Sequence, residues 1–249
     1  MDNKIIIKKE INLYNTDYIS KFLSYPISNE NLSNIGLNLE RISNVTNYVG
    51  ICGGGTQNLY ILSKLCQRNK IREITLIDEN KLQLDHFKHI VAAYNKSLDP
   101  ERYTKEIIKL TKKPLSERVI FNLIRYLRLD RTDYIITNLN RPTFDKNIRI
   151  TLVYGDIFDF LSKIGHKGKY FLYLSNILNY RQRTTNVGKR NFRLKEVLKN
   201  RNIDQSSLLL LITSNTWVEP TKATLIRKFK YIKPEAKPLL MRLFSFRRN

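Results

Sequence analysis

A glycine-rich turn and one acidic residue have the types and spacing of a nucleotide-binding site. Three consecutive glycines, Gly53 to Gly55, follow an apolar run ending at Cys52, and Asp78 ends the next apolar run. Glycines let a ligand approach the backbone, and the N–H groups that begin the following helix favour a polar or anionic group. An acid about 25 residues past the first glycine is near the spacing that places a carboxylate on a ribose. The sequence therefore predicts a nucleotide-type ligand at Gly53, Gly54, Gly55 and Asp78.

The arrangement of the glycines favours one cofactor. The Gly-x-Gly-x-x-Gly spacing of dinucleotide sites is absent, whereas Gly50 and the three later glycines fit the looser first loop of S-adenosylmethionine enzymes. We therefore expect S-adenosylmethionine rather than a nicotinamide dinucleotide. The alternative is that the glycines serve only tight packing of a strand against a helix.

Asp156 is a third candidate for contact with the cofactor. It follows the apolar run 148–154 and precedes a short helical segment. In S-adenosylmethionine enzymes an acid at this place often lies beside the adenine. It can also cap the helix that follows, and the two roles are compatible.

A polar segment after the apolar run 169–174 provides candidates for catalysis. Its residues Ser175, Asn176 and Tyr180 would lie at the carboxyl end of a central strand, beside the point where the strand order reverses. Asn and Tyr side chains can orient a nucleophile or a methionine carboxylate by hydrogen bonds. The alternative is an ordinary polar turn after a strand.

These residues require an α/β architecture. Apolar runs of strand length alternate with segments of helical spacing, which predicts a Rossmann-like, doubly wound sheet of the S-adenosylmethionine methyltransferase type. We expect residues 226–232 and 240–246 to form a C-terminal antiparallel hairpin. A helical insertion at 99–147, beginning with a helix at 101–112, would lie above the strand ends.

The chain is long enough for one substantial core. The chain has 249 residues, of which 42% are hydrophobic, and this suffices for a single α/β core. We expect an N-terminal helical appendage at 1–47 and a cofactor-binding domain at 48–249. There is no run of 18 apolar residues and no secretory signal, which predicts a cytoplasmic or organellar protein. Two cysteines and three histidines support neither a disulfide framework nor a metal site.

The strongest compositional feature is the charge. The chain carries 44 basic and 22 acidic residues, and nearly all of the excess lies after residue 100. A polyanionic partner explains this best, with RNA favoured over DNA; an anionic membrane surface is the second explanation. An AT-rich genome could also enrich lysine without selection for binding.

The candidates for phosphate contact lie in one basic segment: Arg181, Arg183, Lys189, Arg190 and Arg193. The sequence predicts no oligomeric state.

Two stretches resemble a known family. The segment from Asp78 and Asn80 through Gln83 and Leu84 to Lys88 resembles the D-x-N-x-x-Q-L-x-x-x-K signature of the 3-amino-3-carboxypropyl transferases of betaine-lipid synthesis. The phrase LYLSNILNY at 172–180 is similar to a later stretch of the same family. The two matches occur in the family's order and cover the chain from the first glycine-turn strand to the fourth.

The resemblance implies a domain that binds S-adenosylmethionine and transfers its aminocarboxypropyl group rather than its methyl group. It implies that Gly53 and Gly54 pass beneath the methionine part, that Asp78 holds the ribose hydroxyls and that Asp156 lies near the adenine. It places Asn80 within the cofactor signature, and it places Ser175, Asn176 and Tyr180 beside the transferred group.

The sequence lacks an acid at two positions where the family has one. Thr56 stands where the family has a carboxylate, and Asn179 replaces an acid of the later stretch. We therefore carry two hypotheses. The first is an S-adenosylmethionine-dependent transferase of an aminocarboxypropyl or methyl group, acting on a polyanionic substrate such as RNA or DNA. The second is a catalytically inactive, methyltransferase-like RNA-binding subunit of a ribosomal or RNA-processing particle.

Overall fold

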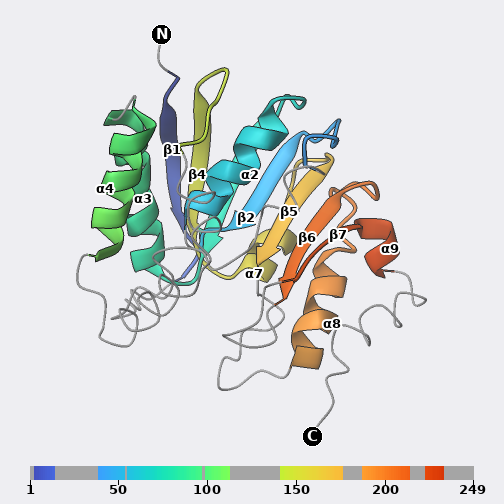
Figure 1. The fold of residues 1–249 in the computed structure, drawn as a ribbon. Helices are drawn as coiled ribbons and strands as arrows, with labels where there is room; N and C mark the ends of the chain where they lie inside the picture. Colours follow the sequence, from blue (N-terminus) through green and yellow to red (C-terminus); the bar gives the residue numbers. More distant parts are fainter. Residues whose placement is uncertain are drawn as a thin grey trace, which may run out of the picture.

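The described part of the chain forms one mixed sheet with helices on both faces. The computed structural model describes residues 3–14, 39–53, 55–96, 99–112, 141–175, 187–213 and 222–232. Within these residues the sheet has seven strands in the order β1-β4-β3-β2-β5-β6-β7 (Figure 1). The strands are β1 (Ile5–Asn12), β2 (Asn47–Ile51), β3 (Glu73–Asp78), β4 (Ile148–Tyr154), β5 (Tyr170–Ser175), β6 (Leu208–Thr213) and β7 (Lys222–Arg227).

The pairing of the strands confirms the predicted fold class. All neighbours from β1 to β6 pair in parallel, and β7 pairs with β6 in antiparallel orientation. Parallel strands with both faces covered consist of nearly continuous apolar residues, as in the run LLLLIT of β6. This explains why β2 to β6 could be recognised from the sequence.

The C-terminal strand lies earlier in the chain than predicted. The antiparallel partner of β6 is 222–227, and Lys228–Ile232 forms the short helix α9 rather than strand. Lys228 and Tyr231 are both buried and lie three residues apart, which is a helical spacing. The ammonium of Lys228 donates hydrogen bonds to the carbonyls of Asn200 (2.9 Å) and Ile203, so the chain turns here. The predicted strand 240–246 falls outside the described residues.

The N-terminal segment contributes a strand to the sheet. We predicted an appendage for residues 1–47, but β1 pairs in parallel with β4 along its whole length, with Ile5 beside Ile148 and Asn12 beside Tyr154. Ile5 is buried, whereas Lys8, Lys9 and Glu10 are exposed. Charged residues of this kind are typical of a protected sheet edge. The rest of the predicted division into appendage and domain remains a prediction, because 15–38 lies outside the described residues.

Helices pack on both faces of the sheet, and each face has its own hydrophobic core. They are α2 (Thr56–Cys66), α3 (Lys81–Lys96), α4 (Pro100–Lys112), α7 (Ile157–Ser162), α8 (Val187–Val197) and α9 (Lys228–Ile232). Successive strand residues belong to different cores: Tyr48 packs with α2 and α3, whereas Val49 packs with α7 and α8. This alternation follows from the twofold period of a strand. The molecule is therefore a three-layer α/β structure.

The predicted helix at 101–112 is present as α4, but its place differs from our expectation. We expected the insertion above the strand ends, whereas α4 packs beside α3, with Tyr103 edge-on to Tyr94 at 6.1 Å between ring centroids. Tyr103 is fully buried in this contact, so burial of an aromatic side chain holds α4 against the sheet layer. Residues 113–140 of the insertion lie outside the described residues.

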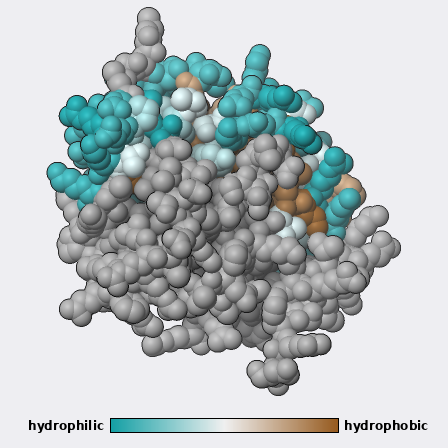
Figure 2. Space-filling view, in the orientation of Figure 1, coloured by the Kyte–Doolittle hydropathy of each residue, from teal (hydrophilic) through white to brown (hydrophobic). Residues whose placement is uncertain are grey.

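The surface of the described part is mostly hydrophilic on the face seen in Figure 2. A smaller hydrophobic area lies on the side where β7 forms the edge of the sheet. Among the described residues, no helix combines the length and hydrophobicity needed to cross a membrane.

Candidate functional site

The candidate site lies at the carboxyl ends of the parallel strands, where the strand order reverses around β2. Hydrogen bonds between loops hold three strand ends together. The N–H of Cys52 donates to the carbonyl of Ile77 at 2.7 Å, and the N–H of Gly155 donates to the carbonyl of Asp78 at 3.0 Å. In open parallel sheets, ligands bind in the crevice outside these ends. The loops after β2, β3 and β4 therefore form one connected edge.

The carboxylate of Asp78 bridges two of these loops. Its Oδ2 accepts a hydrogen bond of 3.1 Å from the backbone N–H of Gly53, and its Oδ1 accepts one of 2.9 Å from the N–H of Asn80. A carboxylate can accept about four hydrogen bonds, so each oxygen retains room for a further donor. The glycine turn and the acid that the sequence predicts as partners in one site are thus in direct contact.

Burial changes the ionisation of the acid groups in this region. It raises the pKa of Asp78 from its ordinary value of 3.8 to about 7, and the hydrogen bonds from Asn80 and Gly53 counteract only part of this effect. Burial also raises the pKa of the Cys52 thiol well above its ordinary value, and the neighbouring Asp78 raises it further. Cys52 is therefore a neutral, buried thiol and not a nucleophile.

The two described glycines of the turn, Gly53 and Gly55, have different structural roles. Gly53 (φ 44°) and Gly55 (φ 77°) both have left-handed backbone conformations that other residues rarely adopt. A Cβ on Gly55 would lie 2.5 Å from Cδ1 of Ile90 in α3, so this glycine is required for close packing. A Cβ on Gly53 would meet the side-chain amide of Gln57 at 3.0 Å and the carbonyl of Ile51 at 3.9 Å. Gly54 lies outside the described residues.

Asn58 holds the glycine turn in place. Its buried side-chain amide donates hydrogen bonds to the carbonyls of Ile51 (3.0 Å) and Cys52 (2.9 Å), and its Oδ1 accepts one of 2.8 Å from the hydroxyl of Tyr48. These bonds join the end of β2 to the first turn of α2. The sequence gives no local signal for this role of Asn58, because the contact with Tyr48 depends on the folded turn.

Two buried polar atoms remain unpaired at the start of α2. Within the described part of the chain, Oγ1 of Thr56 and Oε1 of Gln57 have no hydrogen-bond partner, although the two residues are only 3% and 2% exposed. The preceding residue, Gly55, provides no side-chain cap. The first N–H groups of a helix also lack partners within the helix. Buried polar groups of this kind are usually satisfied by a ligand or water.

Asn80 begins α3. Its Oδ1 accepts a hydrogen bond of 3.0 Å from the N–H of Leu82, and its carbonyl accepts one of 2.9 Å from the N–H of Gln83. The side chain of Gln83 returns to the turn and donates a hydrogen bond to the carbonyl of Gly53. Asn80 and Gln83 thus position the loops through backbone groups. Direct contact of Asn80 with a cofactor remains a prediction.

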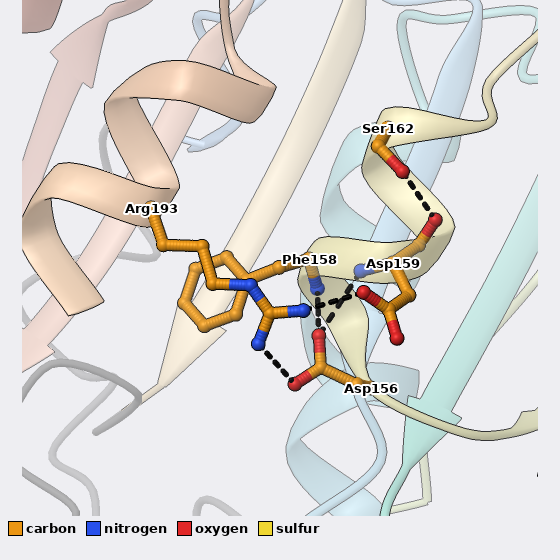
Figure 3. Close-up of polar contacts among 5 residues, drawn as sticks. All are labelled: Asp156, Phe158, Asp159, Ser162 and Arg193. Atoms are coloured by element: carbon orange, nitrogen blue, oxygen red, sulfur yellow. Dashed lines mark hydrogen bonds and ion pairs between the residues drawn. The ribbon is translucent and has the colours of Figure 1, made fainter. Parts of the chain in front are cut away.

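Asp156 caps α7 and binds an arginine (Figure 3). Its Oδ1 accepts hydrogen bonds from the N–H groups of Phe158 (2.7 Å) and Asp159 (3.0 Å), which is the capping role that the sequence offered as an alternative. Its Oδ2 accepts one of 3.0 Å from Nη1 of Arg193. Contact of Asp156 with adenine remains a prediction.

Arg193 is committed to acidic and aromatic neighbours. Besides Asp156, its guanidinium forms an ion pair with Asp159, and it lies over the ring of Phe158 at 4.9 Å from the centroid. These contacts join α8 to α7, as Figure 3 shows. Arg193 was predicted to contact nucleic acid. That contact stays a prediction, and phosphate would have to compete with two carboxylates.

Tyr14 lies at the same edge and was missed from the sequence. Its ring packs edge-on against Tyr154, the last residue of β4, with 4.9 Å between centroids. Burial raises the pKa of its hydroxyl, and the neighbouring carboxylates of Glu79 and Asp156 raise it further. Only the pairing of β1 with β4 brings Tyr14 here. The sequence carries no local signal for that pairing beyond the apolar run of β1.

The remaining predicted residues are placed only in part. Ser175 ends β5, in register with Ile212 of β6, at the same edge of the sheet. Lys189 and Arg190 lie on α8. Four others fall outside the described residues: Asn176, Tyr180, Arg181 and Arg183.

Comparisons with known proteins found a distant similarity in structure and none in sequence. No family model matches the sequence, and no curated protein matches it significantly. Among solved structures, the chain is similar to the rRNA methyltransferase aviRa from Streptomyces viridochromogenes, at 14% identity over 88% of this chain and 92% of that one, with a TM-score of 0.41. A similarity this distant says nothing about substrate or activity. The order and direction of the strands themselves identify an α/β, Rossmann-like fold of the methyltransferase type.

Proposed function

We propose that this protein binds S-adenosylmethionine at the carboxyl ends of β2 and β3 and transfers a group from it to a polyanionic substrate. One observation carries the proposal. Asp78 ends the strand beside β2 with its carboxylate bonded to Gly53, at the place where a nucleoside ribose binds in folds of this order. Both of its oxygens can accept a further hydrogen bond from a ribose diol.

The residues at the start of α2 fit the charged methionine part of this cofactor. Unpaired oxygens of Thr56 and Gln57, together with the first N–H groups of α2, offer acceptors and donors within a buried region. A carboxylate suits the N–H groups and an ammonium suits the oxygens. When bound, the sulfonium would supply an electrophilic carbon with a good leaving group. The protein would then mainly need to orient the acceptor.

The transferred group and the acceptor extend the proposal. Ser175, at the end of β5, together with Asn176 and Tyr180, would border the transferred group. The resemblance of the Asp78–Lys88 segment to aminocarboxypropyl transferases favours that group, and a methyl group is the alternative. The charge of +22 favours RNA as the acceptor, since phosphates would be neutralised by the basic C-terminal half.

Calorimetric titration with S-adenosylmethionine tests the cofactor. We expect binding in the micromolar range, weakened at least about tenfold by Asp78→Asn, because a hydrogen bond to a charged group is lost. Glu73→Gln is a matched control. It removes an exposed acid at the amino end of the same strand and should leave binding unchanged. Absence of heat from the parent protein at millimolar cofactor would exclude the transferase.

The second candidate function is a catalytically inactive RNA-binding subunit. Thr56 and Asn179 favour it, because each stands where the resembling family has an acid. The same titration separates the two functions when RNA binding is measured in parallel. RNA binding without cofactor binding would support the inactive subunit, whereas binding of both would support the transferase.

A further inference from the structure

One aromatic side chain of the described surface is exposed without an evident structural reason. Phe192 in α8 is 65% exposed, and the only other large hydrophobic residue exposed among the described positions is Ile6, at 39%. Leaving a phenylalanine in water forgoes the free energy that burial of its ring would contribute. The helix that carries it already has an apolar face for the core.

The geometry of α8 directs Phe192 away from the protein. Leu194 and Leu198 are fully buried in the core beneath the sheet, and Asn191 accepts a hydrogen bond of 2.8 Å from the hydroxyl of Tyr231. These residues define the inner face. Phe192 lies on the opposite face, near Glu196 and Lys199 in helical spacing, and those two residues form an ion pair of 2.6 Å.

The surroundings of Phe192 are strongly basic. The stretch 187–201 contains six basic residues and one acidic residue. Two of the six already form ion pairs, Lys199 with Glu196 and Arg193 with Asp156 and Asp159. A hydrophobic partner surface would not favour this charge, whereas the phosphates of a nucleic acid would. An exposed aromatic ring among cations is the combination that proteins use to bind single strands, because every base has a face that can stack.

The helix that carries the ring is also joined to the candidate site. The adjacent residue, Arg193, is bonded to Asp156 and Asp159, and Asp156 directly follows β4 at the carboxyl edge. The ion pairs therefore fasten the Phe192 segment of α8 to a loop of the proposed cofactor site. A base bound by Phe192 would therefore lie on the element that is joined to that loop.

We infer that Phe192 is a stacking platform for an unpaired base of RNA, whose phosphates are contacted by the basic residues of the same segment. The inference rests on the RNA substrate proposed above and not on the cofactor. It narrows the substrate class to RNA with an unpaired or single-stranded region.

The test measures binding of a single-stranded RNA of about 12 nucleotides, within the range of site sizes for single-strand surfaces, and of a duplex of equal length. We expect Phe192→Ala to weaken single-strand binding by about 5- to 150-fold, since stacking contributes about 1–3 kcal/mol per base. Duplex binding and the salt dependence should be unchanged, because no charge is removed. Phe192→Tyr should bind as the parent does. Ile6→Ala, at the opposite edge of the sheet, is the matched control and should have no effect.

Two outcomes would overturn the inference. The first is single-strand binding by Phe192→Ala equal to that of the parent. The second is full retention of single-strand binding by Phe192→Leu, which would show that the RNA does not stack on an aromatic ring at this position. In Phe192→Trp, fluorescence at position 192 should be quenched by the RNA strand but not by the same strand lacking its bases. Because these measurements omit the cofactor, a protein that fails to bind S-adenosylmethionine can still pass them.

Discussion

The N–H of Gly53 donates a 3.1 Å hydrogen bond to the carboxylate of Asp78, so the glycine turn after β2 is joined directly to the acid that ends β3. A carboxyl whose pKa is raised to about 7 by burial is held here against backbone donors that prefer its charged form. Burial and the backbone hydrogen bonds shift the pKa of Asp78 in opposite directions, and burial has the larger effect.

The stability of the protein should fall as pH rises through this range. The native pKa of Asp78 is above its ordinary value, so the folded state binds the proton more tightly than the unfolded state. The contribution is greatest near pH 4 and is lost as pH approaches 7. Between pH 5 and 8 it amounts to at most about 3 kcal/mol, and less where water reaches the carboxylate. Urea unfolding of the parent and of Asp78→Asn should show this pH dependence in the parent alone.

Binding of S-adenosylmethionine should have the opposite pH dependence. A ribose diol donates hydrogen bonds, so it favours the ionised carboxylate of Asp78. With a pKa of about 7, roughly one tenth of the molecules are ionised at pH 6 and nine tenths at pH 8. We expect about ninefold tighter binding at pH 8 in calorimetric titrations. An equal ratio in Asp78→Asn would assign the effect to another group.

Loss of the Asn58 side chain should destabilise the turn. Asn58→Ala leaves the carbonyls of Ile51 and Cys52 and the hydroxyl of Tyr48 without their buried partner. We expect a loss of about 2–4 kcal/mol in the free energy of unfolding. Tyr48→Phe removes only one of these bonds and should cost about 1 kcal/mol. Equal losses for the two variants would contradict the central role of Asn58.

Gly55 should tolerate no side chain. In Gly55→Ala the Cβ would meet Ile90 at 2.5 Å and Phe87 at 3.4 Å, and the backbone φ of 77° is strained for alanine. We expect destabilisation by about 2–4 kcal/mol in thermal or urea unfolding. Gly165→Ala is the control, because no heavy atom lies within 4 Å of its added Cβ. A stable Gly55→Ala variant would mean that α3 can move away from the turn.

The ion pairs of Arg193 should make a modest contribution to stability. The side chain of Arg193 is 47% exposed, so Arg193→Ala should cost about 1 kcal/mol or less through lost pairing and stacking. A double-mutant cycle with Asp159→Asn should give a coupling of about 0.3–1 kcal/mol. Lys199→Ala removes an ordinary surface pair with Glu196 just after α8 and should change stability less. No coupling in the cycle would show that the pair with Asp159 is not formed in solution.

The core of the fold could be predicted because its signals are local. β5 and β6 are almost continuous apolar runs, and β3 and β4 are mostly apolar. Short runs of this kind are typical of buried parallel strands. Asp78 could be connected with the glycine turn because the intervening helix sets the distance between consecutive parallel strands. The bounds predicted for the C-terminal strand, 226–232, were wrong, because a short apolar run with mixed spacing fits both a strand and a helix. The strand ends at Arg227, and residues 228–232 form a helix in which Lys228 and Tyr231 are buried.

The sequence by itself determined the strand–turn–helix around Gly53, the acid at position 78 and the excess of positive charge, because each depends on residues close together in the chain or on composition. The tertiary structure alone decided that β1 joins the sheet beside β4, about 140 residues later in the chain, and that this pairing brings Tyr14 to the candidate site. It also decided that Gly55 packs on Ile90 and that Arg193 binds Asp156. Such contacts join residues far apart in the chain, so no local pattern specifies them.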